Sequence, residues 1–157
     1  MTVQVTVKNV EPTTTAFLAV KGPFDQMPGA FGKLIGWLGS KGYAPAGPPF
    51  GVFFDDPAQV TAADLRWELH FPIGEGAPPS GPDEEGLGVK RLEAAEYAFA
   101  IHKGPYDQVG PVWGAVAGWI PANGYRIVGA PQEVYLSDPN STPPEELLTE
   151  IRFPVKK

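Results

Sequence analysis

Two stretches of the chain carry nearly the same sequence: residues 20–37 read VKGPFDQMPGAFGKLIGW, and residues 102–119 read HKGPYDQVGPVWGAVAGW. Both run Lys-Gly-Pro-aromatic-Asp-Gln and end in Gly-Trp, at an offset of 82 residues. The match extends without a gap over residues 7–75 and 89–157, where 24 of 69 positions are identical. Unrelated segments would share only a handful, so the sequence indicates a duplication. Two copies predict a pseudo-dimer, because a solenoid needs three or more repeats.

Each copy predicts the same order of elements, a strand, a helix and two further strands. The first segment is rich in aromatic and apolar residues and stops at Gly-Pro, as a strand does. Apolar residues at helical spacing follow. Two more short apolar runs complete the copy; in the second copy they are QEVYLSDP, residues 132–139, and LLTEIRFPV, residues 147–155. We therefore expect an α+β fold of tandem strand-helix-strand-strand modules, with two antiparallel sheets around a central cleft. The Gly/Pro-rich segment 74–88 is the expected connector.

Composition excludes several classes of function. The 157 residues include no cysteine, so disulfides, thiol catalysis and thiolate metal sites are absent. The net charge is −6 and no basic cluster is present, which argues against a nucleic-acid partner. The N-terminal MTVQVTVKNV alternates like a strand and no apolar run could span a membrane, so a cytoplasmic protein is expected. The two histidines have no carboxylate at ligand spacing, and no phosphate loop occurs, so neither metal nor cofactor is expected.

Alternation along the strands selects candidate site residues. In the final strand of each copy, the face that carries Leu65 and Trp67 is mostly apolar and is expected beneath the helix. The opposite, helix-free face of one copy is expected to face the helix-free face of the other copy across a cleft. On the preceding strands, Phe53 in one copy and Glu133 with Tyr135 in the other are assigned to this helix-free face. The candidate ligand-binding set is Glu150, Tyr135, Glu68, Phe53, Glu133, Trp67, Arg152 and His70.

Two uncertainties accompany this set. A one-residue slip or a bulge would bring Trp67 into the cleft in place of Glu68. Alternatively, the whole helix-free face is solvated, and Glu68 and Glu150 pair with arginines two residues away on the same strands. Both alternatives stay open at the level of sequence.

The motifs GPYDQ, EVYLSDP and LLTEIRFPV resemble those of the GyrI-like small-molecule-binding superfamily. This family includes gyrase-inhibitor-type stand-alone proteins and the effector-binding domains of AraC-type and MerR-type multidrug regulators. The resemblance covers essentially the whole chain and implies one domain over residues 1–157, with paired modules around a cleft. It implies that a carboxylate in the last strand, here Glu150, faces lipophilic cations, and that Tyr135 forms part of the pocket wall.

The resemblance favours a protein that binds hydrophobic, cationic aromatic small molecules, as a sensor or a sequestering protein rather than an enzyme. The repeats run from Val7 to the C-terminus and leave no room for a helix-turn-helix, so direct transcriptional regulation is not expected. Glu150 has Arg152 on one side and Leu148 on the other, whereas Glu68 lies between Arg66 and His70. Glu150 is therefore the expected carboxylate without a fixed partner.

Two other functions stay open. Some relatives of the superfamily resemble hydrolases that open strained, alkylating natural products, for which Glu68 and Glu150 would supply a base with a raised pKa. The doubled architecture is also similar to that of haem-binding proteins of the SOUL type. In that case His102 or His70 would be the axial ligand.

Overall fold

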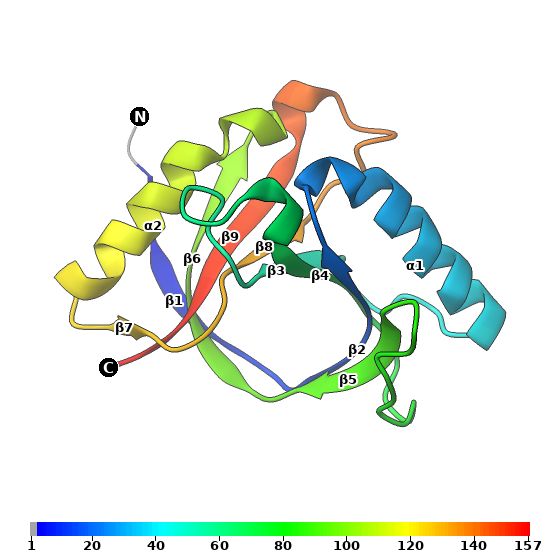
Figure 1. Cartoon of the computed structure of the whole chain (residues 1–157). Coiled ribbons are helices and arrows are strands. Elements are labelled where there is room, and N and C mark those ends of the chain that lie inside the picture. The colour runs from blue at the N-terminus through cyan, green and yellow to red at the C-terminus, as the bar shows by residue number, and fades with distance from the viewer. Residues whose placement is uncertain (1–2) are drawn as a thin grey trace. The chain divides into compact units, whose positions relative to one another are not determined.

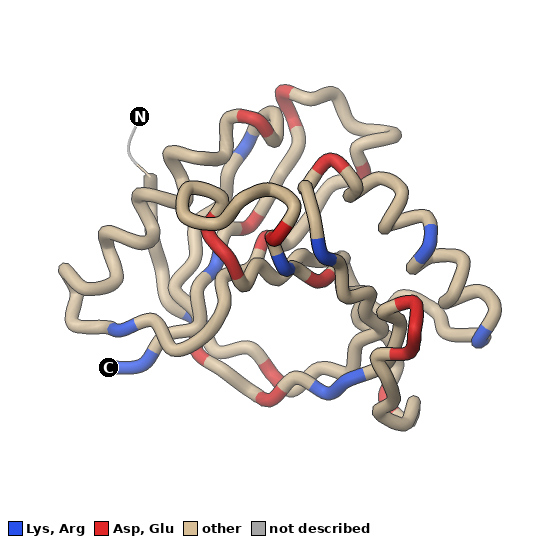
Figure 2. Tube along the Cα trace, viewed as in Figure 1, with Lys and Arg blue, Asp and Glu red and all other residues tan. Residues whose placement is uncertain are grey.

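The computed structural model describes residues 3–157, which form two compact units. Unit 2 is the continuous segment Pro12–Glu93, and unit 1 combines the chain up to Glu11 with Ala94–Lys157. Each unit is an antiparallel sheet with one α-helix, so the α+β class predicted from the sequence is confirmed. Within the described residues, no helix is long and apolar enough to cross a membrane. Lys and Arg residues are spread over both units (Figure 2).

Unit 2 is a four-stranded sheet in the order β3-β4-β2-β5 (Figure 1). Its helix α1 packs on β2 and β4, and buried residues of the helix meet buried residues of the sheet to form one hydrophobic core. Pro28 lies in the first turn of the helix, and Gly42 ends it with φ 73°, a left-handed conformation that glycine adopts without strain. The elements are β2 (Thr13–Lys21), η1 (Phe24–Gln26), α1 (Met27–Lys41), β3 (Phe50–Phe53), η2 (Ala62–Asp64), β4 (Arg66–Pro72) and β5 (Leu87–Leu92).

Unit 1 repeats this architecture in the order β1-β6-β9-β8, with the short strand β7 paired to β9. Helix α2 packs on β6 and β9 (Figure 1). Its buried residues Val112, Val116 and Ile120 follow the helical period and meet the sheet in a second core. The elements are β1 (Thr6–Val10), β6 (Ala95–Lys103), η3 (Tyr106–Gln108), α2 (Gly110–Ala122), β7 (Arg126–Ile127), β8 (Gln132–Tyr135), η4 (Pro144–Glu146) and β9 (Leu148–Lys156).

The two sequence repeats exchange their first strands. Strand β1 begins the first repeat but pairs with β6 of the second, and β5 begins the second repeat but pairs with β2 of the first. The registers correspond at the 82-residue offset, since Val7 faces Ala98 in unit 1 and Val89 faces Ala16 in unit 2. The predicted strand-helix-strand-strand order is present in each unit, and each sheet gains a fourth strand that the other repeat supplies.

Candidate ligand-binding site

The carboxylate of Glu150 is buried and already has two cationic partners in unit 1. Lys8 Nζ lies 2.7 Å from Glu150 Oε1, and Arg152 Nη1 lies 3.4 Å from Oε2. Only 7% of the Glu150 side chain is exposed. The expectation of an uncompensated Glu150 is therefore wrong. Its main partner lies 142 positions away on β1, outside the reach of any argument from neighbours on the same strand.

Unit 2 contains the same arrangement around Glu68. Lys90 Nζ lies 3.0 Å from Glu68 Oε1, and His70 Nε2 lies 2.8 Å from the same oxygen. Burial raises the pKa of Glu68, but the hydrogen bonds from His70 and Lys90 outweigh it and hold this pKa below its ordinary value. Each lysine also lies over an aromatic ring, Lys90 over Phe17 at 4.1 Å and Lys8 over Phe99 at 4.2 Å.

Both other predicted residues of the helix-free face are held in hydrogen bonds. The ring of His70 stacks on Phe50, with centroids 4.8 Å apart, and its Nδ1 lies 2.8 Å from Thr15 Oγ1. Arg152 donates from Nε to Gln132 Oε1 at 2.8 Å, and its guanidinium lies over the ring of Tyr97. The His70 contacts link β4 to β2 and β3, and the Arg152 contacts link β9 to β8 and β6.

Three of the four histidine ring nitrogens lie within hydrogen-bond distance of another group. Both ring nitrogens of His70 are in hydrogen bonds, and burial lowers its pKa. His102 is buried in unit 1, where its Nε2 lies 2.9 Å from the carbonyl oxygen of Pro105. An axial bond to haem iron through any of these three nitrogens would break an existing hydrogen bond.

Trp67 belongs to the hydrophobic core of unit 2. Its exposed fraction is 1%, it contacts the ring of Phe24 edge-on, and its Nε1 donates to the carbonyl oxygen of Gly22 at 2.9 Å. Strand alternation placed Trp67 beneath the helix correctly. Its inclusion among the ligand-binding candidates, through a slipped register, is corrected: β4 pairs with β2 and β3 without a slip at this position.

The face assignment of β3 and β8 was wrong. Phe53 lies directly opposite Trp67, and Tyr135 lies directly opposite Thr149. Directly opposite residues of an antiparallel pair share a face, so Phe53, Tyr135 and Glu133 lie on the helix-covered faces. Phe53 accordingly packs edge-on against Phe24, next to the core of unit 2. In a strand of four residues, alternation separates two faces but does not say which one meets the helix.

On the helix-covered face of unit 1, an acid lies among aromatic side chains. Trp113 Nε1 donates to Glu133 Oε2 at 2.6 Å, and the Tyr135 hydroxyl donates to Glu133 Oε1 at 3.1 Å. The ring of Tyr106 meets Tyr135 edge-on, with centroids 5.9 Å apart. We call these four residues the Glu133 cluster. Helix α2 contributes Trp113, β8 contributes Glu133 and Tyr135, and η3 contributes Tyr106.

The Glu133 carboxylate differs from Glu68 and Glu150 in its electrostatics. Among residues 3–157, no Lys or Arg forms an ion pair with it. Burial raises its pKa above the ordinary value, although the hydrogen bonds from Trp113 and Tyr135 and the proximity of His102 act in the opposite direction. Burial also raises the pKa of the Tyr135 hydroxyl, so Tyr135 remains a neutral donor. The cluster is therefore a half-buried acid held by donors but not neutralised by a cation.

The equivalent positions of unit 2 are apolar. At the 82-residue offset, Glu133 corresponds to Gly51, and the three aromatic members of the cluster correspond to phenylalanines, namely Phe31, Phe53 and Phe24. The polar cluster is thus specific to unit 1. Sequence reasoning selected Glu133 and Tyr135 but missed Trp113 and Tyr106. The signal for them was the substitution of polar aromatics for phenylalanine between the two repeats.

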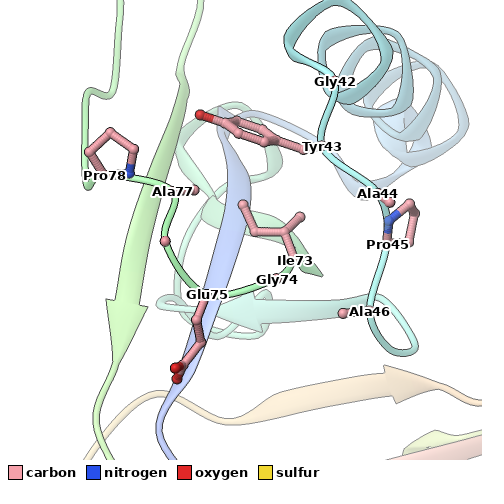
Figure 3. Close-up of a pocket in the computed structure, with 11 residues that line it drawn as sticks. Gly42, Tyr43, Ala44, Pro45, Ala46, Ile73, Gly74, Glu75, Ala77 and Pro78 are labelled. Carbon is pink, nitrogen blue, oxygen red and sulfur yellow. The ribbon is translucent and has the colours of Figure 1, made fainter.

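A separate hollow of about 550 Å³ lies in unit 2, between the C-terminal end of α1 and the segment after β4. Tyr43 and Ile73 lie on its wall, and the Glu75 carboxylate points away from them (Figure 3). Glu75 is also ion-paired with Arg91. Small residues, mainly Gly, Ala and Pro, form the rest of the lining, so the hollow presents few groups that could select a ligand.

The sequence over residues 3–156 matches the model of the GyrI-like small molecule binding domain. The chain belongs to this family. It is 30% identical over 157 residues to a DNA gyrase inhibitor of Edwardsiella piscicida, covering 98% of this chain and 99% of that protein. It is 31% identical over 102 residues to the probable transcriptional regulator YgiV of Escherichia coli K12, covering 63% of this chain. The match spans only 62% of the length of YgiV.

Solved structures share the fold of this GyrI-like chain. The EcmrR C-terminal domain superimposes with a TM-score of 0.80 at 23% identity, covering 100% of this chain and 99% of that one. SAV2435 bound to tetraphenylphosphonium superimposes with a TM-score of 0.59 at 15% identity, covering 99% of this chain and 94% of that one. At these identities the likeness establishes the fold, and the family match establishes small-molecule binding as the function of the domain.

Proposed function

We propose that this GyrI-like domain binds hydrophobic aromatic cations through the Glu133 cluster of unit 1, as a sensor or a sequestering protein. The observation that carries the proposal is the half-buried Glu133 carboxylate, which Trp113 and Tyr135 hold in place and which has no Lys or Arg partner among the described residues. A partly desolvated charge is costly without a counter-charge. An aromatic cation would supply that charge and gain cation–π attraction from the aromatic rings.

The other two acids of the original candidate set fit this role less well. Glu150 and Glu68 each have a lysine within hydrogen-bond distance, so a cationic ligand would have to displace it. The lowered pKa of Glu68 also gives no support to a hydrolase that uses it as a base. The presence of tetraphenylphosphonium in SAV2435, a protein of the same fold, supports a lipophilic cation as the ligand class.

Removing the charge of Glu133 should weaken cation binding without harming the fold. We expect Glu133→Gln to lose about 1–3 kcal/mol of binding free energy for tetraphenylphosphonium, the scale of an interaction with a charged group. Isothermal titration calorimetry measures this loss. The matched control is Glu145→Gln, an exposed acid in η4. Equal affinities in the two variants would contradict the role of Glu133.

Binding of a permanently charged cation should also depend on pH. The raised pKa of Glu133 means that the carboxylate protonates at a higher pH than an ordinary glutamate. Cation affinity should therefore be full above this raised pKa and fall as the pH decreases through it. The linked effect on stability has the opposite direction: in the free protein this group favours folding at low pH, and that contribution is lost as the pH rises through the folded-state pKa.

Titration of tetraphenylphosphonium binding from about pH 4, near the ordinary glutamate pKa, up to about pH 8 tests this dependence. The Glu133→Gln variant should show a flat profile. A wild-type profile as flat as that of the variant would exclude Glu133 as the titrating group.

A further inference from the structure

Thr149 carries a buried hydroxyl group without a partner. It lies on β9 directly opposite Tyr135, on the same face as the Glu133 cluster. Its exposed fraction is 1%, and its Oγ1 makes no hydrogen bond in the described structure. Buried hydroxyls are nearly always hydrogen-bonded, because an unmade bond costs the desolvation of the group. The free protein therefore leaves one hydrogen-bonding position unfilled beside its acid cluster.

The nearest polar neighbours on this face already have other bonds. His102, opposite Thr149 on β6, has its Nε2 at the Pro105 carbonyl oxygen, and the Tyr135 hydroxyl donates to Glu133. Neither residue forms a hydrogen bond with the Thr149 hydroxyl, which has no partner among the described residues.

The equivalent position in unit 2 has no buried polar group without a hydrogen bond. Trp67 corresponds to Thr149, and its indole is buried in the core with Nε1 bonded to the carbonyl oxygen of Gly22. Unit 2 thus fills this position with a large, satisfied side chain. In unit 1 the side chain is smaller and its hydroxyl is unsatisfied, on the same face as the acid and the polar aromatic side chains, where unit 2 has a glycine and phenylalanines. The unsatisfied hydroxyl thus occurs in the unit that also carries the Glu133 cluster.

We propose that the Thr149 hydroxyl contacts the ligand by accepting a hydrogen bond from an N–H of the bound cation. The preferred ligands are then protonated aromatic amines and amidines, which present an N–H together with a positive charge. Fully alkylated cations bring the charge alone. This inference rests on the proposed function of the Glu133 cluster and adds to it the chemical class that the site selects.

The test uses two planar dyes of equal charge, with wild-type protein and three variants. Acridine orange protonated at its ring nitrogen has its only N–H there, and its N10-methyl derivative has none. Thr149→Val keeps the shape and removes the hydroxyl, Thr149→Ser keeps the hydroxyl, and Glu133→Gln removes the charge. Fluorescence titration gives the dissociation constants. We expect the wild type and Thr149→Ser to bind protonated acridine orange about tenfold more tightly than the methylated dye, the scale of one hydrogen bond to a charged group.

In Thr149→Val this preference should fall to near unity while the methylated dye binds as in the wild type. The double-mutant cycle isolates the hydroxyl, because any steric effect of the methyl group persists in the valine variant. A preference that is unchanged in Thr149→Val would overturn the inference and leave the proposed function standing. A Glu133→Gln variant that binds both dyes like the wild type would overturn the proposed function, and the inference with it.

Discussion

Replacing Trp67 by alanine is expected to lower the free energy of unfolding by about 3–5 kcal/mol, the usual cost of removing a large aromatic side chain from a core. The indole is almost fully buried, contacts Phe24 edge-on and donates a hydrogen bond to Gly22. The variant loses all three contributions at once. Urea denaturation followed by circular dichroism measures the change. The slope of the unfolding free energy against urea concentration should equal that of the wild type if only stability has changed.

The control for this substitution is Trp37→Ala. Trp37 lies on α1 with its ring partly exposed and edge-on to Tyr43, so its loss should cost less. Equal losses in the two variants would contradict the central place of Trp67 in the core. If Trp67→Ala is stable but no longer binds a cation, Trp67 is part of the ligand-binding site.

Glu150→Gln is expected to destabilise the protein by about 2–3 kcal/mol, although the substitution keeps the shape of the side chain. The amide leaves Arg152, whose side chain is 11% exposed, and Lys8 without their carboxylate. The cost is below that of a fully buried pair, because 37% of the Lys8 side chain is exposed and can be hydrated. Urea denaturation of Glu150→Gln, Lys8→Met and the double variant gives the coupling energy.

In that cycle the double variant should be less destabilised than the sum of the single variants, because Lys8→Met removes one of the two cations that lose the Glu150 carboxylate in Glu150→Gln. Cation affinity of the folded Glu150→Gln protein should stay near that of the wild type. A large loss of affinity with no loss of stability would show that Glu150, rather than Glu133, is the charge that faces the ligand.

Several features of the fold could be predicted from the sequence because they depend on short-range patterns. The strand that contains Trp67 and Leu69 alternates clearly over seven residues, and its apolar side is indeed beneath the helix. The repeat itself predicted that both sheets would be built alike, and their registers correspond residue by residue. Long periodic segments determine both the type of an element and its buried side.

The candidate site could not be predicted from such short-range patterns, because it depends on strand pairing and long-range contacts. Strand β8 is four residues long, and only its pairing with β9 shows that Glu133 and Tyr135 meet the helix. The partners of Glu150 and Glu68 are lysines of the exchanged strands, which the order of residues along a strand cannot reveal. The unpartnered hydroxyl of Thr149 is a property of the packed structure alone.

The exchange of first strands also sets the order in which a ribosome can complete the two units. All of unit 2 lies between Pro12 and Glu93, so it can close as soon as β5 has emerged. Strand β1 is synthesised first, yet its partner β6 begins only at Ala95, and β9 follows at Leu148. Long-range strand pairing of this kind is slow to form. The unit that carries the acid cluster is therefore completed last, and because it contains residues from both ends of the chain, a truncation at either end removes part of it.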